Sequence, residues 1–348
     1  MKNRKVVYLI EVIVIVLLII VTILGQGIGT EAKKDSTVKI GFSMDSLVVE
    51  RWQYDKDFFV SACKRLGANV IVKTGNNNTE LQIEQIKELI NLDIDVLVIV
   101  PHDYSSLAGV INQAKKKGIK VIAYDRLIKD ANIDMYISFD NEKVGRLMGG
   151  YLYNLVPKGN YVLINGAKED NNAILYQKGV MGVIGESVAE GDIHIIDEIW
   201  CNDWREDYSY QLIDTLLTQG KQIDAIMCGN DRLAEAAIQA LAERRLVGKV
   251  AIVGHDASIA GCKRIIEGSQ GATVYKSLKT LAETAADYAV QLAKGEKIIA
   301  SQKMDNGKVT VPYHQEDVYL VDKKGIEDII IKQNVYKPSE IYGHSGEQ

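Results

Sequence analysis

The segment Asp95–Val100 has the sequence DVLVIV and is apolar at every position after its first residue. A strand with one exposed face alternates apolar and polar residues, whereas a strand buried on both faces is a continuous apolar run. Helices that lie on both sides of a parallel sheet bury its strands in this way. DVLVIV therefore predicts an interior strand of a parallel sheet that is covered by helices.

Short runs of the same kind recur from Val38 onward and alternate with segments of helical period. Thr79–Asn91, for example, places most of its apolar residues on one face of a helix. The alternation predicts an α/β fold with doubly wound parallel sheets. The expected strands are Val38–Met44, Asn69–Lys73, Asp95–Val100, Lys120–Ala123, Tyr161–Asn165, His194–Ile199, Asp224–Cys228, Val250–Gly254 and Gly271–Tyr275.

The alternation pauses around Met135–Asp140 and begins again with GNYVLINGA at residues 159–167. Two such cycles predict two doubly wound parallel-sheet lobes joined by a hinge. Because the patterns resume after the second cycle, we expect returning chain to complete the lobes. The expected boundaries are 35–140 for the N-terminal lobe, completed by part of 277–310, 141–276 for the C-terminal lobe, completed by part of 311–325, and 326–348 for a C-terminal tail. The tail contains Pro338 and two glycines and is expected to be a loose or wrapping end.

Residues 1–34 are expected to form a transmembrane or signal helix with a short link to the body. Basic residues at positions 2, 4 and 5 precede the apolar segment Val6–Leu24, which is interrupted only by Glu11 and Thr22. A spanning helix needs about 20 predominantly apolar residues, whereas the core of a signal peptide has about 7–15. The length favours an uncleaved single-pass anchor in the cell membrane with the body of the chain extracytoplasmic, although Thr30-Glu31-Ala32 offers a poor cleavage site.

Composition and motifs argue against several classes of function. The chain has 348 residues and a formal net charge of -5 without a basic stripe, so nucleic acid is not expected as a partner. The sequence has no P-loop, G-x-S-x-G or H-E-x-x-H and no nucleophile beside a base, so we expect no enzyme. The five histidines lack metal-ligand spacing, so no metal or cofactor is expected. The four cysteines are scattered and are expected to be buried free thiols, although a disulfide stays open.

Polar and aromatic side chains follow most of the predicted strands. In open parallel sheets ligands bind outside the carboxyl ends of the strands, so we expect these side chains at one cleft. They are Asp45, Arg51, Trp52, Asp125, Arg126, Asp170, Asn171, Asn172, Trp200, Trp204, Asn230, Asp231, Asp256 and Lys276. Carboxylate, amide and guanidinium groups can each hold two neighbouring hydroxyls, and an indole can cover the apolar face of a pyranose. The set predicts a site for a small polyhydroxylated molecule.

A purely structural role is the alternative for several of these residues. Asp and Asn are common helix N-caps, and Asn230, Asp231 and Asp256 all precede helical patterns. For Arg51 and Trp52, in the stretch ERWQYD, the alternative is a surface arginine beside a core tryptophan. The recurrence of Arg, Lys and Trp at the same topological position favours the binding site.

Several segments resemble the D-xylose-binding proteins, within the type I periplasmic sugar-binding fold. They are ERWQYD, TGNNNTELQIEQIKELI, DVLVIVP, AYDR, YISFDNEKVGRLMG, GNYVLINGAKEDNNA, GKVAIVGHDA and ATVYK, and the similarity runs from about Val38 to Asp322. The resemblance implies two lobes that close on one pentose, D-xylose or a closely related sugar. It implies sugar contacts from Arg51, Trp52, Asp125, Arg126, Asn172, Trp204, Asn230, Asp256 and Lys276. The tryptophans at 52 and 204 are then expected against opposite sides of the ring, and Trp200 is left as a core residue.

The N-terminus departs from the pattern of released or lipid-held relatives, because residues 1–62 contain no cysteine that could carry a lipid. A binding protein held by its own helix cannot move freely to a permease, but it can stay beside another membrane protein. We therefore expect a D-xylose receptor that signals to a membrane partner, a two-component sensor kinase. The alternative is the substrate-binding component of a xylose ABC transporter, whose partner is the permease.

Overall fold

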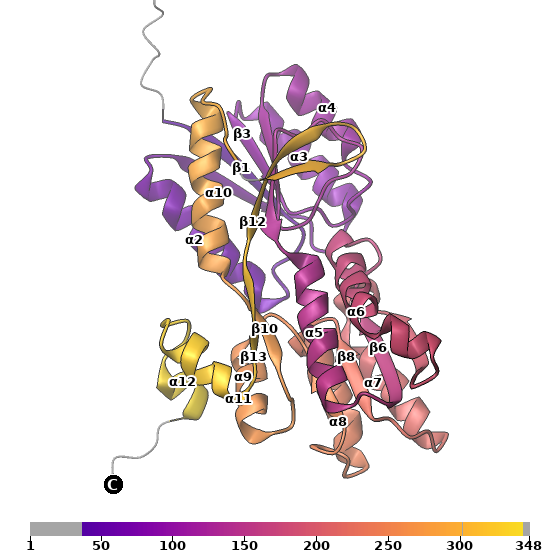
Figure 1. The fold of residues 1–348 in the computed structure, drawn as a ribbon. Helices are drawn as coiled ribbons and strands as arrows, with labels where there is room; N and C mark the ends of the chain where they lie inside the picture. The colour runs from indigo at the N-terminus through magenta and orange to yellow at the C-terminus, as the bar shows by residue number, and fades with distance from the viewer. Residues whose placement is uncertain (1–36, 301, 344–348) are drawn as a thin grey trace, which may run out of the picture. The chain divides into compact units, whose positions relative to one another are not determined.

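The computed structural model describes residues 37–300 and 302–343, which build a seven-stranded and a four-stranded sheet with parallel cores and a two-stranded antiparallel sheet (Figure 1). The first sheet has the strand order β11-β12-β5-β4-β3-β1-β2, and only the β11–β12 pair is antiparallel. Its strands are β1 (Lys39–Met44), β2 (Asn69–Thr74), β3 (Val96–Ile99), β4 (Lys120–Tyr124), β5 (Met135–Phe139), β11 (Gln302–Asp305) and β12 (Thr310–Glu316).

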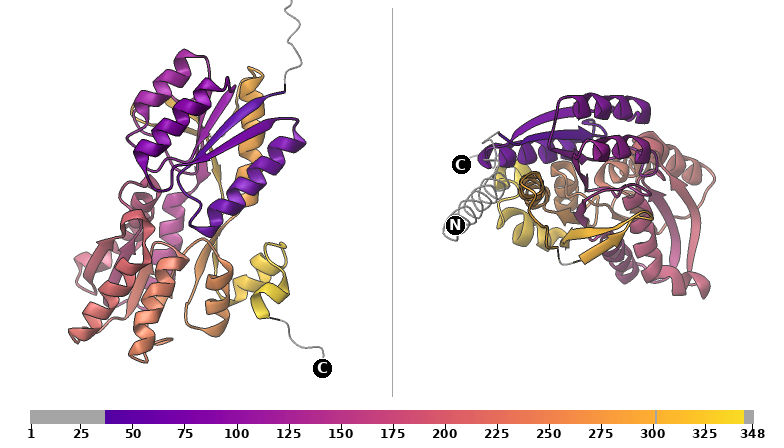
Figure 2. Two further views of the ribbon diagram at one scale, coloured as in Figure 1. Left: turned by 180° about the vertical axis from the view of Figure 1, so that it is seen from behind. Right: turned by 90° about the horizontal axis from the view of Figure 1, so that it is seen from above.

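Helices cover both faces of the first sheet, and we call the sheet with these helices the first lobe. The helices are α2 (Glu50–Arg65), α3 (Thr79–Asn91), α4 (Ala108–Lys116) and α10 (Leu278–Ala293). Helices α2 and α10 lie side by side although they are far apart in the sequence (Figures 1 and 2). In β3, Val96 and Val98 join the apolar cluster that includes α2 and α10, while Leu97 and Ile99 join the cluster of α3 and α4. The predicted burial of this strand on both faces is confirmed.

The second sheet has the order β7-β6-β8-β9, all parallel, and an antiparallel pair, β10-β13, is linked to it by a bridge between Val253 and Ala272. Its strands are β6 (Gly159–Asn165), β7 (Ile193–Trp200), β8 (Ala225–Cys228), β9 (Ala251–Val253), β10 (Thr273–Lys276) and β13 (Val318–Val321). The helices around it are α5 (Asn141–Leu155), α6 (Asn171–Ala189), η1 (Asn202–Trp204), α7 (Glu206–Thr218), α8 (Asp231–Glu243), α9 (Ile259–Glu267), α11 (Lys323–Gly325), η2 (Ile326–Ile331) and α12 (Pro338–Tyr342). We call this assembly the second lobe.

Within the described residues, the chain passes between the two lobes at three places: from β5 to α5, from β10 to α10, and from β12 to β13. Short connections of this kind can act as hinges between rigid parts. Strand β12 pairs with β5 of the first sheet, so the last passage follows Glu316. The lobe boundaries expected from the sequence stay predictions.

The predicted α/β class with parallel sheets is confirmed, and the strands expected from the sequence are present with ends that shift by one or two residues. The pause expected at Met135–Asp140 is wrong, because Met135–Phe139 forms β5, a fully buried strand between β4 and β12. Its second neighbour lies far along the chain, and local sequence patterns do not reveal such a partner.

The sequence predicts a loose or a wrapping C-terminal tail, and the described part of this tail is docked on the body. Residues 338–342 form α12, which begins with Pro338 in its first turn and packs on α9. Proline is well tolerated at this position because the first helical N–H has no partner in the helix. Ile341 is buried in an apolar cluster with Ile326 and Ile330 of η2, so the described part of the tail is docked on the second lobe.

The expected transmembrane or signal helix, residues 1–34, lies outside the described residues. Among residues 37–300 and 302–343, no helix is both long and apolar enough to cross a membrane. All four cysteines lie in the described part of the chain, and each is buried with a free thiol, as the sequence predicted.

The two-sided burial of β3 predicts that substitutions on both of its faces destabilise the protein. Leu97→Ala should lower the free energy of unfolding by about 2–5 kcal/mol, because it removes buried methylene groups and leaves a cavity. Val98→Ala should lower it by about 1.5 kcal/mol or more. Urea unfolding measures both values, with Leu92→Ala, at a position that is 48% exposed, as the control. A stable variant on either face would contradict the burial of β3.

Candidate functional site

A small buried cavity lies between the lobes, where the carboxyl ends of strands from both sheets meet. Its volume is about 30 Å³. The cavity is lined by Val49, Arg51, Trp52, Asp125, Arg126, Asp170, Asn172, Tyr176, Trp204, Asn230, His255 and Asp256. One water molecule needs a cavity of about 10–15 Å³, so this cavity holds little more than water. Side chains or lobes therefore have to move before a sugar can enter.

Of the side chains predicted to contact a ligand, all but Lys276 line this cavity. Lys276 ends β10 and lies next to it, with its Nζ 3.0 Å from Asp256 Oδ1 and donating to Tyr176 Oη at 3.3 Å. The predicted set is therefore brought together in one place by strands and helices of both lobes. Its role in ligand binding stays a prediction.

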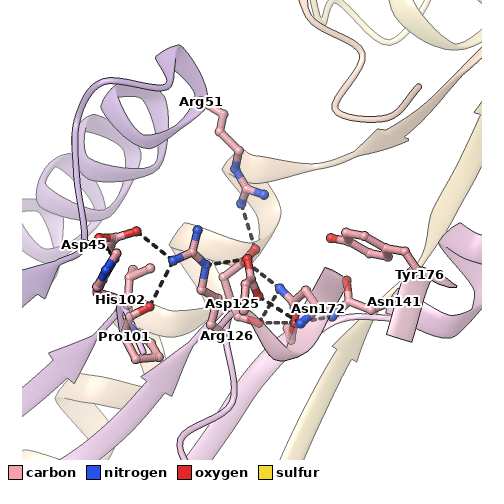
Figure 3. A network of polar contacts seen from close by, with 12 residues as sticks. Asp45, Arg51, Pro101, His102, Asp125, Arg126, Asn141, Asn172 and Tyr176 are labelled. Carbon is pink, nitrogen blue, oxygen red and sulfur yellow. Dashed lines mark hydrogen bonds and ion pairs between the residues drawn. The ribbon is translucent and has the colours of Figure 1, made fainter. Parts of the chain in front are cut away.

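Arg51 contacts three carboxylates and is the hub of the charged groups. Figure 3 shows one of these contacts, from Arg51 to Asp125. Arg51 lies in the first turn of α2, and its side chain is only 10% exposed. Its Nη2 donates to Asp125 Oδ2 at 2.7 Å, its Nε donates to Asp55 Oδ2 at 3.3 Å, and its Nη1 lies 3.6 Å from Asp256 Oδ1. Asp125 follows β4 in the first lobe and Asp256 follows β9 in the second, so one guanidinium joins both lobes.

The charged side chains around Arg51 stabilise the ionised forms of one another. Burial disfavours a charged Arg51, but the carboxylates of Asp125, Asp55 and Asp256 raise its pKa well above the usual range. Burial likewise works against the charge of Asp125, but Arg51 and Lys276 lower its pKa. Asp55, which is buried deeper, has a pKa raised to about 6, mainly by burial. Removal of one partner would therefore leave a buried charge without compensation.

Asp256 and Lys276 form the second centre of charge. Burial alone would raise the pKa of Asp256, and the neighbouring positive groups, Lys276 and Arg51 among them, lower it below its usual range. The backbone of Asp256 has φ of 99°, a strained conformation for a residue other than glycine. His255 stays neutral because burial lowers its pKa to about 3. The strained turn after β9 thus places a carboxylate, not a capping residue, at the cavity.

Helix capping explains only part of the strand-end pattern. Asn230 does cap α8, since its Oδ1 accepts from the backbone N–H of Leu233 at 2.9 Å, and it also lines the cavity. Asp256 is not a cap, because Ser258 caps α9. Asp231 is buried away from the cavity and accepts from Ser258 N at 2.9 Å and from Gln270 Nε2 at 2.7 Å, which holds the turn that carries Asp256.

Asn172 links the lobes through its uncharged amide, which bonds to the carboxylate of Asp125. It lies in the first turn of α6, and its Nδ2 donates to Asp125 Oδ1 at 2.9 Å. Its Oδ1 accepts from Asn141 Nδ2, also at 2.9 Å, where α5 begins (Figure 3). These two bonds fix which end of the Asn172 amide is the donor and which is the acceptor.

The two tryptophans that are expected against the sugar ring, Trp52 and Trp204, have different environments. The guanidinium carbons of Arg51 and Arg126 lie 4.2 Å and 5.3 Å from the centre of the Trp52 ring, so Trp52 supports the arginines. Trp204 packs on Gly166, where an added Cβ would come within 2.2 Å of the indole, so only glycine fits there. The indole N–H of Trp204 is buried without a hydrogen-bond partner among the described residues.

Four residues at the cavity were not predicted as ligand contacts, and one predicted core residue is placed elsewhere. The four are Val49, Asp170, Tyr176 and His255. Tyr176 stands four residues after Asn172 on α6, so helical spacing could have identified it. His255 precedes Asp256, and its ring centre is 4.5 Å from that of Tyr176. Trp200 is half-buried at the end of β7 beside Lys168, not in the core as expected, because β7 is the edge strand of its sheet.

Comparison with known proteins identifies the fold and the family. The family model described as periplasmic binding protein domain matches residues 40–297. The chain belongs to the periplasmic binding protein family. It is 46% identical to the D-xylose-binding periplasmic protein of Haemophilus influenzae over 306 residues, which are 88% of this chain and 92% of that protein. It is 44% identical to the D-xylose-binding periplasmic protein of Escherichia coli over 328 residues, or 94% of this chain and 98% of that protein.

A solved structure supports the same membership. An ABC transporter solute binding protein from Clostridium phytofermentans, with bound β-D-glucose, has a TM-score of 0.80 and 27% identity to this periplasmic binding protein. The match covers 87% of this chain and 99% of that chain. These relatives are named as binding proteins, which agrees with the expectation that the chain is not an enzyme.

A second, larger chamber of about 280 Å³ adjoins the cavity and shares Arg126, Asp170 and Trp204 with it. His102 stands in its wall, where its Nδ1 is 2.8 Å from Asp45 Oδ1 and its Nε2 is 3.7 Å from Asp203 Oδ1. The bond to Asp45 raises the pKa of His102 above its usual value of 6.5, although burial partly opposes the shift.

The raised pKa of His102 predicts a pH dependence of stability. A group whose pKa is raised on folding contributes fully below its unfolded pKa, about 6.5, and loses the contribution as pH rises through the folded value. The free energy of unfolding of the wild type should therefore exceed that of His102→Gln at pH 5.5, and the difference should shrink above pH 6.5. Urea unfolding at a series of pH values measures it. A difference that grows with pH would contradict the assignment.

Proposed function

We propose that this protein is an extracytoplasmic receptor for D-xylose that closes on the sugar and delivers it to an ABC permease. The observation that carries the proposal is the convergence of the side chains implied by the resemblance on one buried cavity between two lobes. The identity of 44–46% to proteins named as D-xylose-binding, over most of the chain, supports the choice of sugar.

The chemistry of the cavity suits a pentose. Asp125 and Asp256 present oxygens that can accept from sugar hydroxyls, while Arg51, Lys276 and the Nδ2 of Asn230, whose oxygen caps α8, can donate. Each hydroxyl can donate and accept at once, so neighbouring hydroxyls fit between oppositely charged side chains. Loss of one partner leaves a buried polar group unpaired at a cost of about 1–3 kcal/mol, which lets the pocket reject an epimer.

Ligand contacts from both lobes couple binding to closure. Asp125 and Arg51 belong to the first lobe, whereas Asp256, Asn172 and Trp204 belong to the second. A sugar that bonds to both sets interacts fully only in the closed arrangement, and it therefore shifts the population toward that arrangement. The hinge segments between the lobes allow this movement, and a permease can recognise the closed form.

The transport function is favoured over the sensor kinase that the N-terminus suggested. The solved relative from Clostridium phytofermentans is described as an ABC transporter solute binding protein. The segment that motivated the kinase lies outside the described residues. The second hypothesis is a membrane-anchored receptor that signals to a two-component sensor kinase. The identity of the co-purified membrane partner distinguishes transport from sensing.

The sugar assignment predicts a thermal shift. At 100 times its dissociation constant, D-xylose should stabilise the folded protein by about 2.7 kcal/mol and raise the melting temperature by about 5 °C. D-ribose, D-lyxose and L-arabinose, which each invert one hydroxyl, should give smaller shifts at equal concentration. Scanning fluorimetry measures this series. If none of these pentoses moves the melting temperature, the assignment to a pentose is wrong.

Tryptophan substitutions provide a matched pair for the site. Trp204→Ala should abolish the shift with D-xylose, because it removes the indole that lines the cavity. Trp200→Ala removes the same side chain outside the cavity and should keep the shift. Circular dichroism shows whether each variant is folded. An equal loss of the shift in both variants would speak against a specific role of Trp204.

Partners can be identified from native membranes. The full chain, expressed in its membrane and cross-linked with and without D-xylose, should recover permease peptides in mass spectrometry. The same experiment determines the mature N-terminus. Recovery of a sensor kinase with residues 1–34 intact would overturn the transport function in favour of sensing.

A further inference from the structure

Arg126 makes an ion pair between the lobes that uses no ligand atom. It follows β4 of the first lobe, and its Nη1 donates to Asp45 Oδ2 at 2.7 Å and to the carbonyl of Pro101 at 3.0 Å in the same lobe (Figure 3). Its Nε lies 2.8 Å from Oδ2 of Asp170, which belongs to the second lobe. Arg126 and Asp170 are 5% and 3% exposed, so the pair is shielded from water.

Asp170 is fixed by its own lobe. It is the N-cap of α6, and its Oδ1 accepts from the backbone N–H of Asn172 at 2.9 Å. The N-terminus of a helix attracts negative charge, so the carboxylate is oriented whether or not Arg126 is near. One oxygen accepts the capping bond of the helix, and the other lies at ion-pair distance from Arg126 Nε without a hydrogen bond from it among the described residues.

Because Asp170 is buried, its ionised form depends on the ion pair with Arg126. Burial raises the pKa of Asp170, and Arg126 and the capping bond only partly offset this. When the lobes separate, Asp170 returns to water, and Arg126 keeps Asp45 as a partner. The ion pair between Arg126 and Asp170 therefore needs both lobes together, whereas the pair of Arg126 with Asp45 does not.

We propose that Arg126 and Asp170 form a clamp that favours closure of the lobes independently of sugar, which makes Asp170 a positioning residue that sets the affinity. The apparent dissociation constant of a ligand rises when the binding-competent form becomes less populated. Loss of the clamp should therefore open the lobes before any sugar is added and weaken sugar binding as a consequence. Only the second effect rests on the proposed function.

The test compares the full chain with Asp170→Asn. Asparagine keeps an oxygen that can cap α6 but removes the charge that pairs with Arg126. Asp170→Ser, with another good capping residue, is a second variant. Glu169→Gln is the matched control, since it makes the same charge change at the neighbouring exposed residue.

Fluorescent labels report the separation of the lobes. Lys116→Cys in the first lobe and Glu190→Cys in the second are exposed positions, and the native thiols are all buried. Single-molecule energy transfer without sugar should show a larger share of open molecules in Asp170→Asn and Asp170→Ser than in the wild type or Glu169→Gln. The dissociation constant for D-xylose should rise about tenfold, mainly through faster release.

Two results would overturn the clamp. The first is an unchanged distribution of lobe separations in the sugar-free Asp170 variants. The second is weaker D-xylose binding without such a change, because Asp170 would then act on the sugar itself. If the wild type binds no pentose while the sugar-free distributions still differ, the clamp stands and the proposed function fails.

Discussion

The contact of Arg51 with Asp125 and Asp256 is the constraint on which the site depends, because these charges are buried and need one another. A buried carboxylate or guanidinium is tolerated only with partners at bonding distance. The fold meets this demand from three directions: Arg51 comes from the first turn of α2, Asp125 from the turn after β4, and Asp256 from the turn after β9. The positive φ angles of Asp125 and Asp256, 62° and 99°, show that the backbone is bent to deliver them.

These buried charges lie in both lobes, so their contacts depend on the position of one lobe relative to the other. The hub joins the lobes through Arg51 and Asp256, and Arg126 with Asp170 joins them a second time. A polyhydroxylated ligand can replace part of these contacts, since its hydroxyls donate and accept in the same places. The charged groups bond to each other across the cleft, and in the proposed function they would bind a sugar with little extra desolvation. Two hydrogen bonds orient the amide of Asn172, and the indole N–H of Trp204, which has no partner among the described residues, offers one more donor.

The sequence predicted much of the site because parallel sheets bring the carboxyl ends of their strands together. Asp125, Asp256 and Lys276 each follow a strand that its apolar run identifies, and this rule placed them at one cleft. Tyr176 was missed because it lies inside a helix, one turn beyond a strand-end residue. Strand β5 was missed because its partner β12 lies far along the chain. Roles that depend on individual hydrogen bonds could be identified only from the structure. One example is Asn230, which both caps α8 and lines the cavity.

Calorimetric titration of D-xylose into the wild type and Arg51→Lys tests the central claim most directly. Lysine keeps the positive charge but loses the planar fork that reaches several carboxylates at once. The account predicts a single site in the wild type and an affinity at least about 100-fold weaker in Arg51→Lys, with both proteins folded. A wild type that releases no heat with D-xylose, or a variant that binds as tightly as the wild type, would contradict it.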